Sequence, residues 1–144
     1  MRSSLVDKVR IIEYNENKLL ARNSQHDLYK VLNYSVDYFS NNNSAYFVGT
    51  IFKIRGALYK LNSCSIFGSN NRLCTICNLN EIEDTYHFIG KCPIFSAFRF
   101  QCFGERTLEL SQVINILNAS NFFELYNYLK LALNYRNMII NEFN

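Results

Sequence analysis

Apolar residues recur at three- and four-residue steps along much of the 144-residue chain. This spacing places them on one face of a helix, and it predicts helices over residues 4–20, 25–39 and 45–61. A short helix is expected over 111–118, and the last helix follows Asn121. Because alternating runs typical of strands are scarce, the sequence predicts a mostly α fold with at least five helices.

Two of these helices have regular apolar stripes. In the third, the stripe consists of Phe47, Ile51, Ile54, Leu58 and Leu61. At the start of the last helix, Asn121 followed by Glu124 fits a variant of the capping box with asparagine as the N-cap. One face of that helix is then formed by Leu125, Leu129, Ala132 and Ile139.

Nothing in the sequence divides the chain into separate domains, because it contains no internal repeat and no linker rich in Gly, Ser or Pro. We expect a single domain over residues 1–144, a length that can bury a core without disulfides. Within it, 1–46 is expected to supply N-terminal helices, 47–103 a helix and a cysteine-rich segment, and 104–144 the C-terminal helices.

Composition agrees with a folded chain, since 49% of residues are hydrophobic and 19% are charged. No apolar run reaches about 18 residues, and charges interrupt the N-terminal stretch, so neither a membrane span nor a signal peptide is expected. We therefore expect an intracellular protein of the nucleus or cytoplasm, in which disulfides are rare.

The net charge of +3 is too small to indicate a nucleic-acid-binding protein by itself. Basic residues do gather in the middle of the chain, where few acids oppose them: Lys53, Arg55, Lys60, Arg72, Lys91, Arg99 and Arg106. Such a group is equally typical of an ordinary solvated surface.

The stretch "RLCTICNLNEIEDTYHFIGKCPIF" holds three of the five cysteines and one of the two histidines. The ligand-like residues are Cys74, Cys77, His87 and Cys92, with two, nine and four residues between them. Zinc prefers four such ligands in a tetrahedron, and a pair of cysteines two residues apart can be aimed inward by one tight turn. The spacing therefore predicts a small helical domain built around a CCHC zinc site.

The second half of this motif, from Glu83 to Pro93, has the sequence signals of one short helix followed by the start of another. A short helix that begins near Glu83 or Asp84 would carry His87 and end at Gly90, a favourable residue just after a helix. Cys92 would then be the N-cap of another helix that begins with Pro93, where backbone dipoles stabilise a thiolate.

Two alternatives remain for these residues: buried free cysteines beside a partly exposed histidine, and an all-cysteine site that uses Cys102 in place of His87. Cys64 and Cys102 are otherwise expected in the core, and His26 on the surface.

Four protein ligands leave no open position for water, so a structural zinc is expected. The acids Glu81, Glu83 and Asp84 are interpreted as a solvated cluster, and without a catalytic motif no enzyme activity is expected.

The strings "FKIRGALYKLN", "LCTICN" and "EIEDTYHFIGKCPIFSAFR" resemble the CCHC zinc-binding region at the C-terminal end of reverse transcriptases from non-LTR retrotransposons. The resemblance covers about residues 47–103. It implies Cys74, Cys77, His87 and Cys92 as ligands, and Arg55 and Arg99 as the flanking arginines of that family. Polymerase chemistry is not implied, because the chain has no Asp-Asp pair, and the endonuclease pattern is also missing after Cys92.

The resemblance implies a nucleic-acid-binding module without polymerase or endonuclease activity. Weak, phosphate-directed binding of RNA or DNA is expected through Arg55, Arg72, Lys91 and Arg99. The nearby aromatic residues are Tyr86, Phe88, Phe95, Phe98 and Phe100. Most of them are expected in the core, and one or two are expected to stack on bases. The alternative is a structural or protein-interaction domain, whose helices would pack on an upstream polymerase body or another protein. Neither a membrane nor a small-molecule substrate is expected.

Overall fold

The computed structural model of the chain describes residue 32 and residues 44–62 and 72–142. The helices predicted over 4–20 and 25–39 lie outside the described residues, as do His26 and Cys64. Leu32 is the exception within the second of these segments, and it is buried in the hydrophobic core.

The described residues are mainly helical, as the sequence predicts. In chain order the elements are α3 (Ala45–Arg55), the π-helical turn η2 (His87–Lys91), the 3-10 turn η3 (Pro93–Phe95), α4 (Ser96–Phe103), α5 (Leu110–Leu117) and α6 (Phe123–Glu142). Within the same residues, strand pairing is limited to one isolated antiparallel bridge between Leu73 and Ile82.

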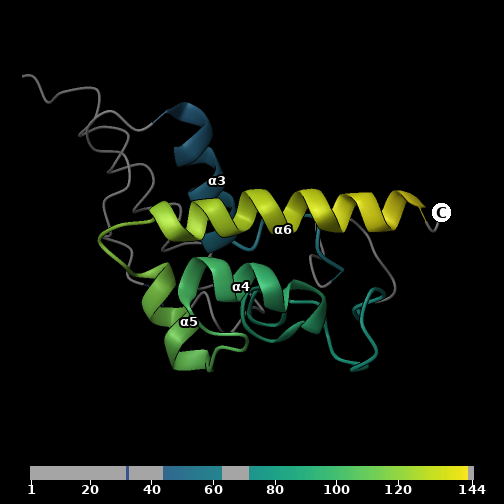
Figure 1. Cartoon of the computed structure of the whole chain (residues 1–144). Helices are drawn as coiled ribbons and strands as arrows, with labels where there is room; N and C mark the ends of the chain where they lie inside the picture. Colours follow the sequence, from purple (N-terminus) through teal and green to yellow (C-terminus); the bar gives the residue numbers. More distant parts are fainter. Residues whose placement is uncertain (1–31, 33–43, 63–71, 143–144) are drawn as a thin grey trace, which may run out of the picture.

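Helix α6 is the longest described element, and both α3 and α4 pack against it (Figure 1). Helix α4 packs along it, and α3 crosses its N-terminal half at a steep angle. The π-helical turn contacts both α4 and α5. The core between these elements is mainly apolar and includes Ile51, Ile54, Phe88, Ile89, Phe95, Val113, Leu117, Leu125 and Leu129, and the side chains of Arg99 and Tyr128 are also fully buried there.

Helix α3 begins where the sequence predicts and ends earlier. The side chain of Ser44 accepts a hydrogen bond from the N–H of Phe47 at 3.1 Å, so the start is capped. The helix ends at Arg55 rather than at residue 61, because Gly56 and Ala57 turn the chain, the latter with a φ of 53°. Leu61 is still buried, which explains why its apolar spacing extended the predicted helix beyond its true end.

The later helices have clear local signals at their ends. Gly104 closes α4 in the left-handed conformation with a φ of 78°, which glycine adopts at little cost. At α5 the N–H of Glu109 donates to Gln112 at 2.7 Å as part of a capping box. Asn121 accepts from the N–H of Phe123 at 2.9 Å, but α6 begins at Phe123 and the carbonyl of Phe122 accepts its first helical bond, from Tyr126, so the predicted N-cap is one residue too early.

Candidate metal centre

Residues 72–83, called the knuckle below, form a tight antiparallel loop. The N–H of Cys74 donates to the carbonyl of Glu81 at 2.8 Å, and the N–H of Glu83 donates to the carbonyl of Arg72 at 2.9 Å. The left-handed conformation of Asn80, with a φ of 56°, belongs to the turn between these strand-like ends. The loop therefore brings Cys74 and Cys77 to one side of a rigid backbone frame.

Backbone N–H groups point at the sulfur atoms. Hydrogen bonds reach Cys74 from Ile76, Cys77 from Leu79 and Cys92 from Ile94, in each case from two residues further along the chain. Burial raises the pKa of Cys77, and the bond from Leu79 opposes that rise. These donors stabilise the thiolate forms, which are the forms that bind a metal ion.

His87 and Cys92 are brought together by the π-helical turn. The carboxylate of Asp84 accepts from the N–H of His87 at 2.7 Å and so starts the turn. The N–H of Cys92 then donates to the carbonyl of His87 at 2.8 Å. An i to i+5 bond of this kind brings Cys92 back over His87, on the same face of the helical turn.

Gly90 differs from its predicted role as a residue just after a helix. It lies inside the π-helical turn and is buried. A Cβ atom there would lie 3.0 Å from the carbonyl oxygen of Leu108, the Tyr86 ring and a methyl of Val113. Glycine is thus needed for close packing rather than for ending a helix. The expectation for Cys92 is confirmed, because it is the N-cap residue directly before Pro93.

The four predicted ligands converge. The candidate ligand atoms of Cys74, Cys77, His87 and Cys92 all lie within 4.8 Å of one another, and Cys77 Sγ is 3.5 Å from His87 Nε2. A tetrahedral metal ion with Cys and His ligands holds its ligand atoms roughly 3.5 to 3.8 Å apart. Cys102 is absent from this cluster and lies half-buried on α4. The group could therefore hold a metal ion with His87 as the fourth ligand.

The burial of the cluster also suits a metal ion. Cys74, His87 and Cys92 are buried, and Cys77 is half-buried. The hydrogen bond between Cys74 and Cys92 lowers the pKa of Cys74 to about 3 and raises that of Cys92. A buried thiolate is therefore already favoured within the group, and a cation would neutralise it.

Glu81 orients the ring of His87 by contacting Nδ1, the ring nitrogen that is not the candidate ligand atom. Its Oε2 lies 3.3 Å from His87 Nδ1 and 2.8 Å from Lys91 Nζ. The bond with Lys91 holds the pKa of Glu81 below its ordinary value. A carboxylate that accepts from Nδ1 leaves Nε2 free to bind a metal ion, which is the arrangement found behind many metal-binding histidines.

Replacing Glu81 by Gln should weaken metal binding by about 10- to 100-fold, because the neutral amide is a poorer acceptor for the ring N–H. Competition with a chromophoric chelator would measure this. Glu105→Gln is the matched control, since Glu105 is exposed and outside the cluster. Equal affinities for the two variants would contradict this role for Glu81.

The interpretation of the three acids as a solvated cluster is wrong for Glu83, whereas Glu81 and Asp84 are partly exposed. Glu83 is 2% exposed and pairs with Arg136 through contacts of 2.5 and 2.9 Å. The same carboxylate accepts from the N–H of Asn62 at 3.0 Å. It thereby ties the knuckle both to α6 and to the segment that follows α3.

Two of the four predicted phosphate-binding residues are buried. Arg55 is 4% exposed and donates to the carbonyl of Leu117 at 3.0 Å. Arg99 is fully buried, and its guanidinium donates to the carbonyls of Ile89, Cys92 and Arg106. Both guanidinium groups are inaccessible to a ligand and are hydrogen-bonded to the backbone. The prediction that Arg55 and Arg99 bind phosphates is therefore wrong.

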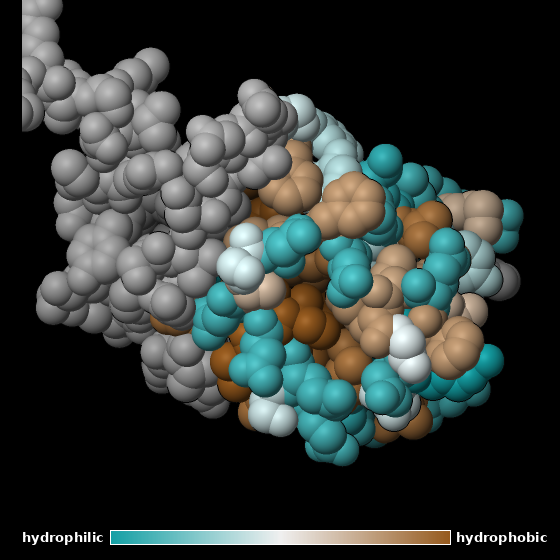
Figure 2. Space-filling model, turned by 60° about the vertical axis from the view of Figure 1, so that its left-hand side comes forward, coloured by the Kyte–Doolittle hydropathy of each residue, from teal (hydrophilic) through white to brown (hydrophobic). Residues whose placement is uncertain are grey.

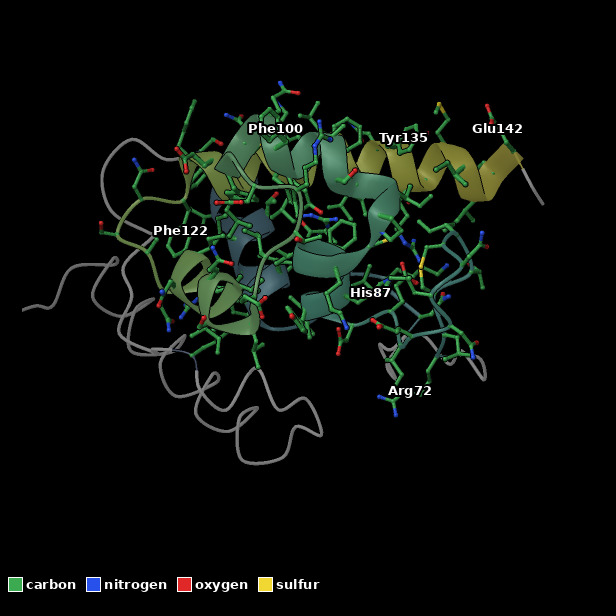
Figure 3. The ribbon with its side chains drawn as sticks, turned by 60° about the horizontal axis from the view of Figure 1, so that its bottom comes forward. Arg72, His87, Phe100, Phe122, Tyr135 and Glu142 are labelled. Carbon is green, nitrogen blue, oxygen red and sulfur yellow. The ribbon has the colours of Figure 1, made fainter. Side chains whose placement is uncertain are left out.

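The other two predicted residues are accessible. Arg72 is exposed, and Figure 3 shows it extending away from the body at the same end of the molecule as His87. The side chain of Lys91 is 38% exposed. Arg106 was not among the predicted phosphate-binding residues, and its guanidinium lies 4.9 Å from the centre of the exposed Phe100 ring. Of the nearby aromatic residues, Phe88 and Phe95 are in the core, as expected.

Comparison of the chain with protein-family models, curated proteins and solved structures gives no significant match. The resemblance to retrotransposon reverse transcriptases therefore rests on the motif residues alone. No helix in the described part of the chain is long and apolar enough to cross a membrane.

Proposed function

We propose that the metal ion is zinc and that its role is structural. The convergence of three cysteines and one histidine supports this, because zinc favours sulfur and nitrogen ligands in a closed tetrahedron. With four protein ligands the ion has no open position at which to activate water, so the proposal includes no catalytic role. The ion would fix the knuckle against the π-helical turn.

We further propose that the domain is a nucleic-acid-binding module, similar to the C-terminal region of non-LTR retrotransposon reverse transcriptases. One observation carries this proposal: Arg72 is exposed on the knuckle itself, with Lys91 close to the metal ligands. Arg106 stacked on exposed Phe100 adds a pair that can bind a phosphate and a base together.

Binding should be weak and directed mainly at phosphates. With two to three accessible cations, the logarithmic salt slope should be roughly −1.4 to −2.7. Replacing Arg72 and Arg106 together by Ala should weaken binding to every oligonucleotide by a similar factor and make the salt slope shallower. Fluorescence anisotropy with labelled single-stranded and duplex probes at low salt would measure both.

Lys53→Ala combined with Lys130→Ala is the charge-matched control, since both lysines are exposed on α3 and α6. This control should retain most of the affinity. No binding by the wild type at low salt would overturn the proposal. If the two double variants lose the same affinity, Arg72 and Arg106 are not the residues that bind the phosphates.

A protein-docking role is the second candidate, favoured by aromatic exposure at the starts of α3 and α6. Tyr46 is 70% exposed and Phe123 is 62% exposed. The Tyr46 ring also meets the Tyr126 ring edge to face at 6.2 Å, so the aromatic surface extends between the helices. Figure 2 shows hydrophobic side chains in the middle of one face of the molecule, with hydrophilic side chains around them. Exposed aromatic groups of this kind are common in protein interfaces.

A further inference from the structure

A hollow of about 330 Å³ lies between the knuckle and the turn that follows it, and the candidate metal ligand His87 is part of its lining. Its volume is at the lower end of the range that small ligands occupy, about 300–1,000 Å³. The hollow is formed by two short segments that are fixed by backbone bonds and by the metal ligands. Its shape therefore depends on the same interactions that hold the site together.

The apolar wall of the hollow includes Leu73, Ile82 and Tyr86. Leu73 and Ile82 face each other across the antiparallel bridge and are 37% and 44% exposed. Two large apolar side chains held at this exposure on a rigid backbone can cover the flat face of a ring. Tyr86 is half-buried and adds an aromatic surface to the wall.

The charged groups of the hollow are Glu81, Asp84 and Lys91, and the polar side chains of Asn80 and His87 also line it. Glu81 is already bonded to Lys91 at 2.8 Å, and one oxygen of Asp84 accepts from the N–H of His87. An ionised carboxylate has about four acceptor sites, so Asp84 keeps acceptor capacity towards the hollow. Two carboxylates against one ammonium disfavour a phosphate here and favour a neutral group that donates hydrogen bonds.

We propose that this hollow binds one unstacked base of a single-stranded nucleic acid, and that the base presents its exocyclic amino group to Asp84. The proposal rests on the nucleic-acid-binding function above and specifies it. The ring faces the apolar wall, and Asp84 accepts from the amino group as carboxylates do from the N4 amino group of cytosine. Exposed Arg72 directly precedes Leu73 of the apolar wall and meets a flanking phosphate. Uracil and thymine carry an oxygen in place of the amino group, so at that position they meet a repulsive acceptor and keep only the adjacent N3–H as a donor.

Short oligocytidylate and oligouridylate test this, because their bases differ only in the amino group or oxygen at C4 and in the proton on the adjacent N3. Wild-type protein should bind oligocytidylate about fivefold to tenfold more tightly. Ile82→Ala should weaken that binding roughly tenfold. Leu79→Ala should leave it unchanged, since Leu79 is 47% exposed in the same loop and does not line the hollow. Metal content confirms that both variants are folded.

Asp84→Asn gives an independent readout. The amide oxygen can still cap the N–H of His87, while the amide nitrogen can donate to a uracil oxygen. The preference for oligocytidylate should therefore shrink or reverse. Equal binding of the two oligonucleotides by the wild type, or equal effects of Ile82→Ala and Leu79→Ala, would overturn the inference and leave general nucleic-acid binding intact. Failure to bind any oligonucleotide would overturn both.

Discussion

Replacing Cys92 by Ser should unfold the domain under conditions in which Cys102→Ser remains folded. Cys92 is fully buried and joins the cluster, whereas Cys102 lies half-buried on α4 outside it. Apparent binding free energies of structural zinc are about 10–16 kcal/mol, which is as large as the whole stability of most domains, about 5–15 kcal/mol. Losing a ligand should therefore remove most of the folding free energy.

Thermal unfolding followed by circular dichroism would measure this difference. Addition of a strong chelator to the wild type should have the same effect as Cys92→Ser, and Cys102→Ser should respond to the chelator as the wild type does. A Cys92→Ser protein that melts at the same temperature as Cys102→Ser would show that the cluster does not stabilise the fold through a metal ion.

Arg99→Met should lower the stability by about 3 kcal/mol or more, because it removes three hydrogen bonds that a fully buried guanidinium donates to backbone carbonyls. The three acceptors are the carbonyls of Ile89, Cys92 and Arg106, so a single guanidinium joins the π-helical turn, a metal ligand and the loop after α4. Tyr128 supports the same region, since its hydroxyl donates to the carbonyl of Phe88 at 2.6 Å.

The expected drop in melting temperature for Arg99→Met is roughly 10 °C. Arg99→Lys should recover only part of it, because one ammonium cannot reach all three carbonyls. Arg106→Met is the control and should change stability by no more than about 0.5 kcal/mol, since that side chain is exposed. An Arg99→Met variant as stable as Arg106→Met would contradict the structural role of the buried guanidinium.

The sequence predicted those features that depend on residues close together in the chain, namely the cysteine and histidine cluster and the starts of helices. The Cys-x2-Cys spacing and the placement of Cys92 before Pro93 indicated the cluster that the structure brings together. The start of α3 was also predicted, and that of α6 to within one residue, because helix starts depend on a few adjacent residues. The mostly α fold followed from the spacing of the apolar residues.

Features that depend on distant partners could not be predicted in this way. The burial of Arg55 and Arg99 results from carbonyls supplied by other segments, and an isolated arginine in the sequence is typical of the surface. Glu83 and Arg136 form a buried pair across 53 positions. One signal was present: Arg136 lies four residues after Ala132, on the apolar face of the last helix.

Native mass spectrometry of the full chain, purified without chelators and incubated with zinc, tests the central claim most directly. The structure predicts a mass that exceeds the polypeptide by one zinc ion in the wild type and in Cys102→Ser, and by none in Cys92→Ser. A folded wild-type protein that carries the polypeptide mass alone would contradict the claim that Cys74, Cys77, His87 and Cys92 hold a zinc ion.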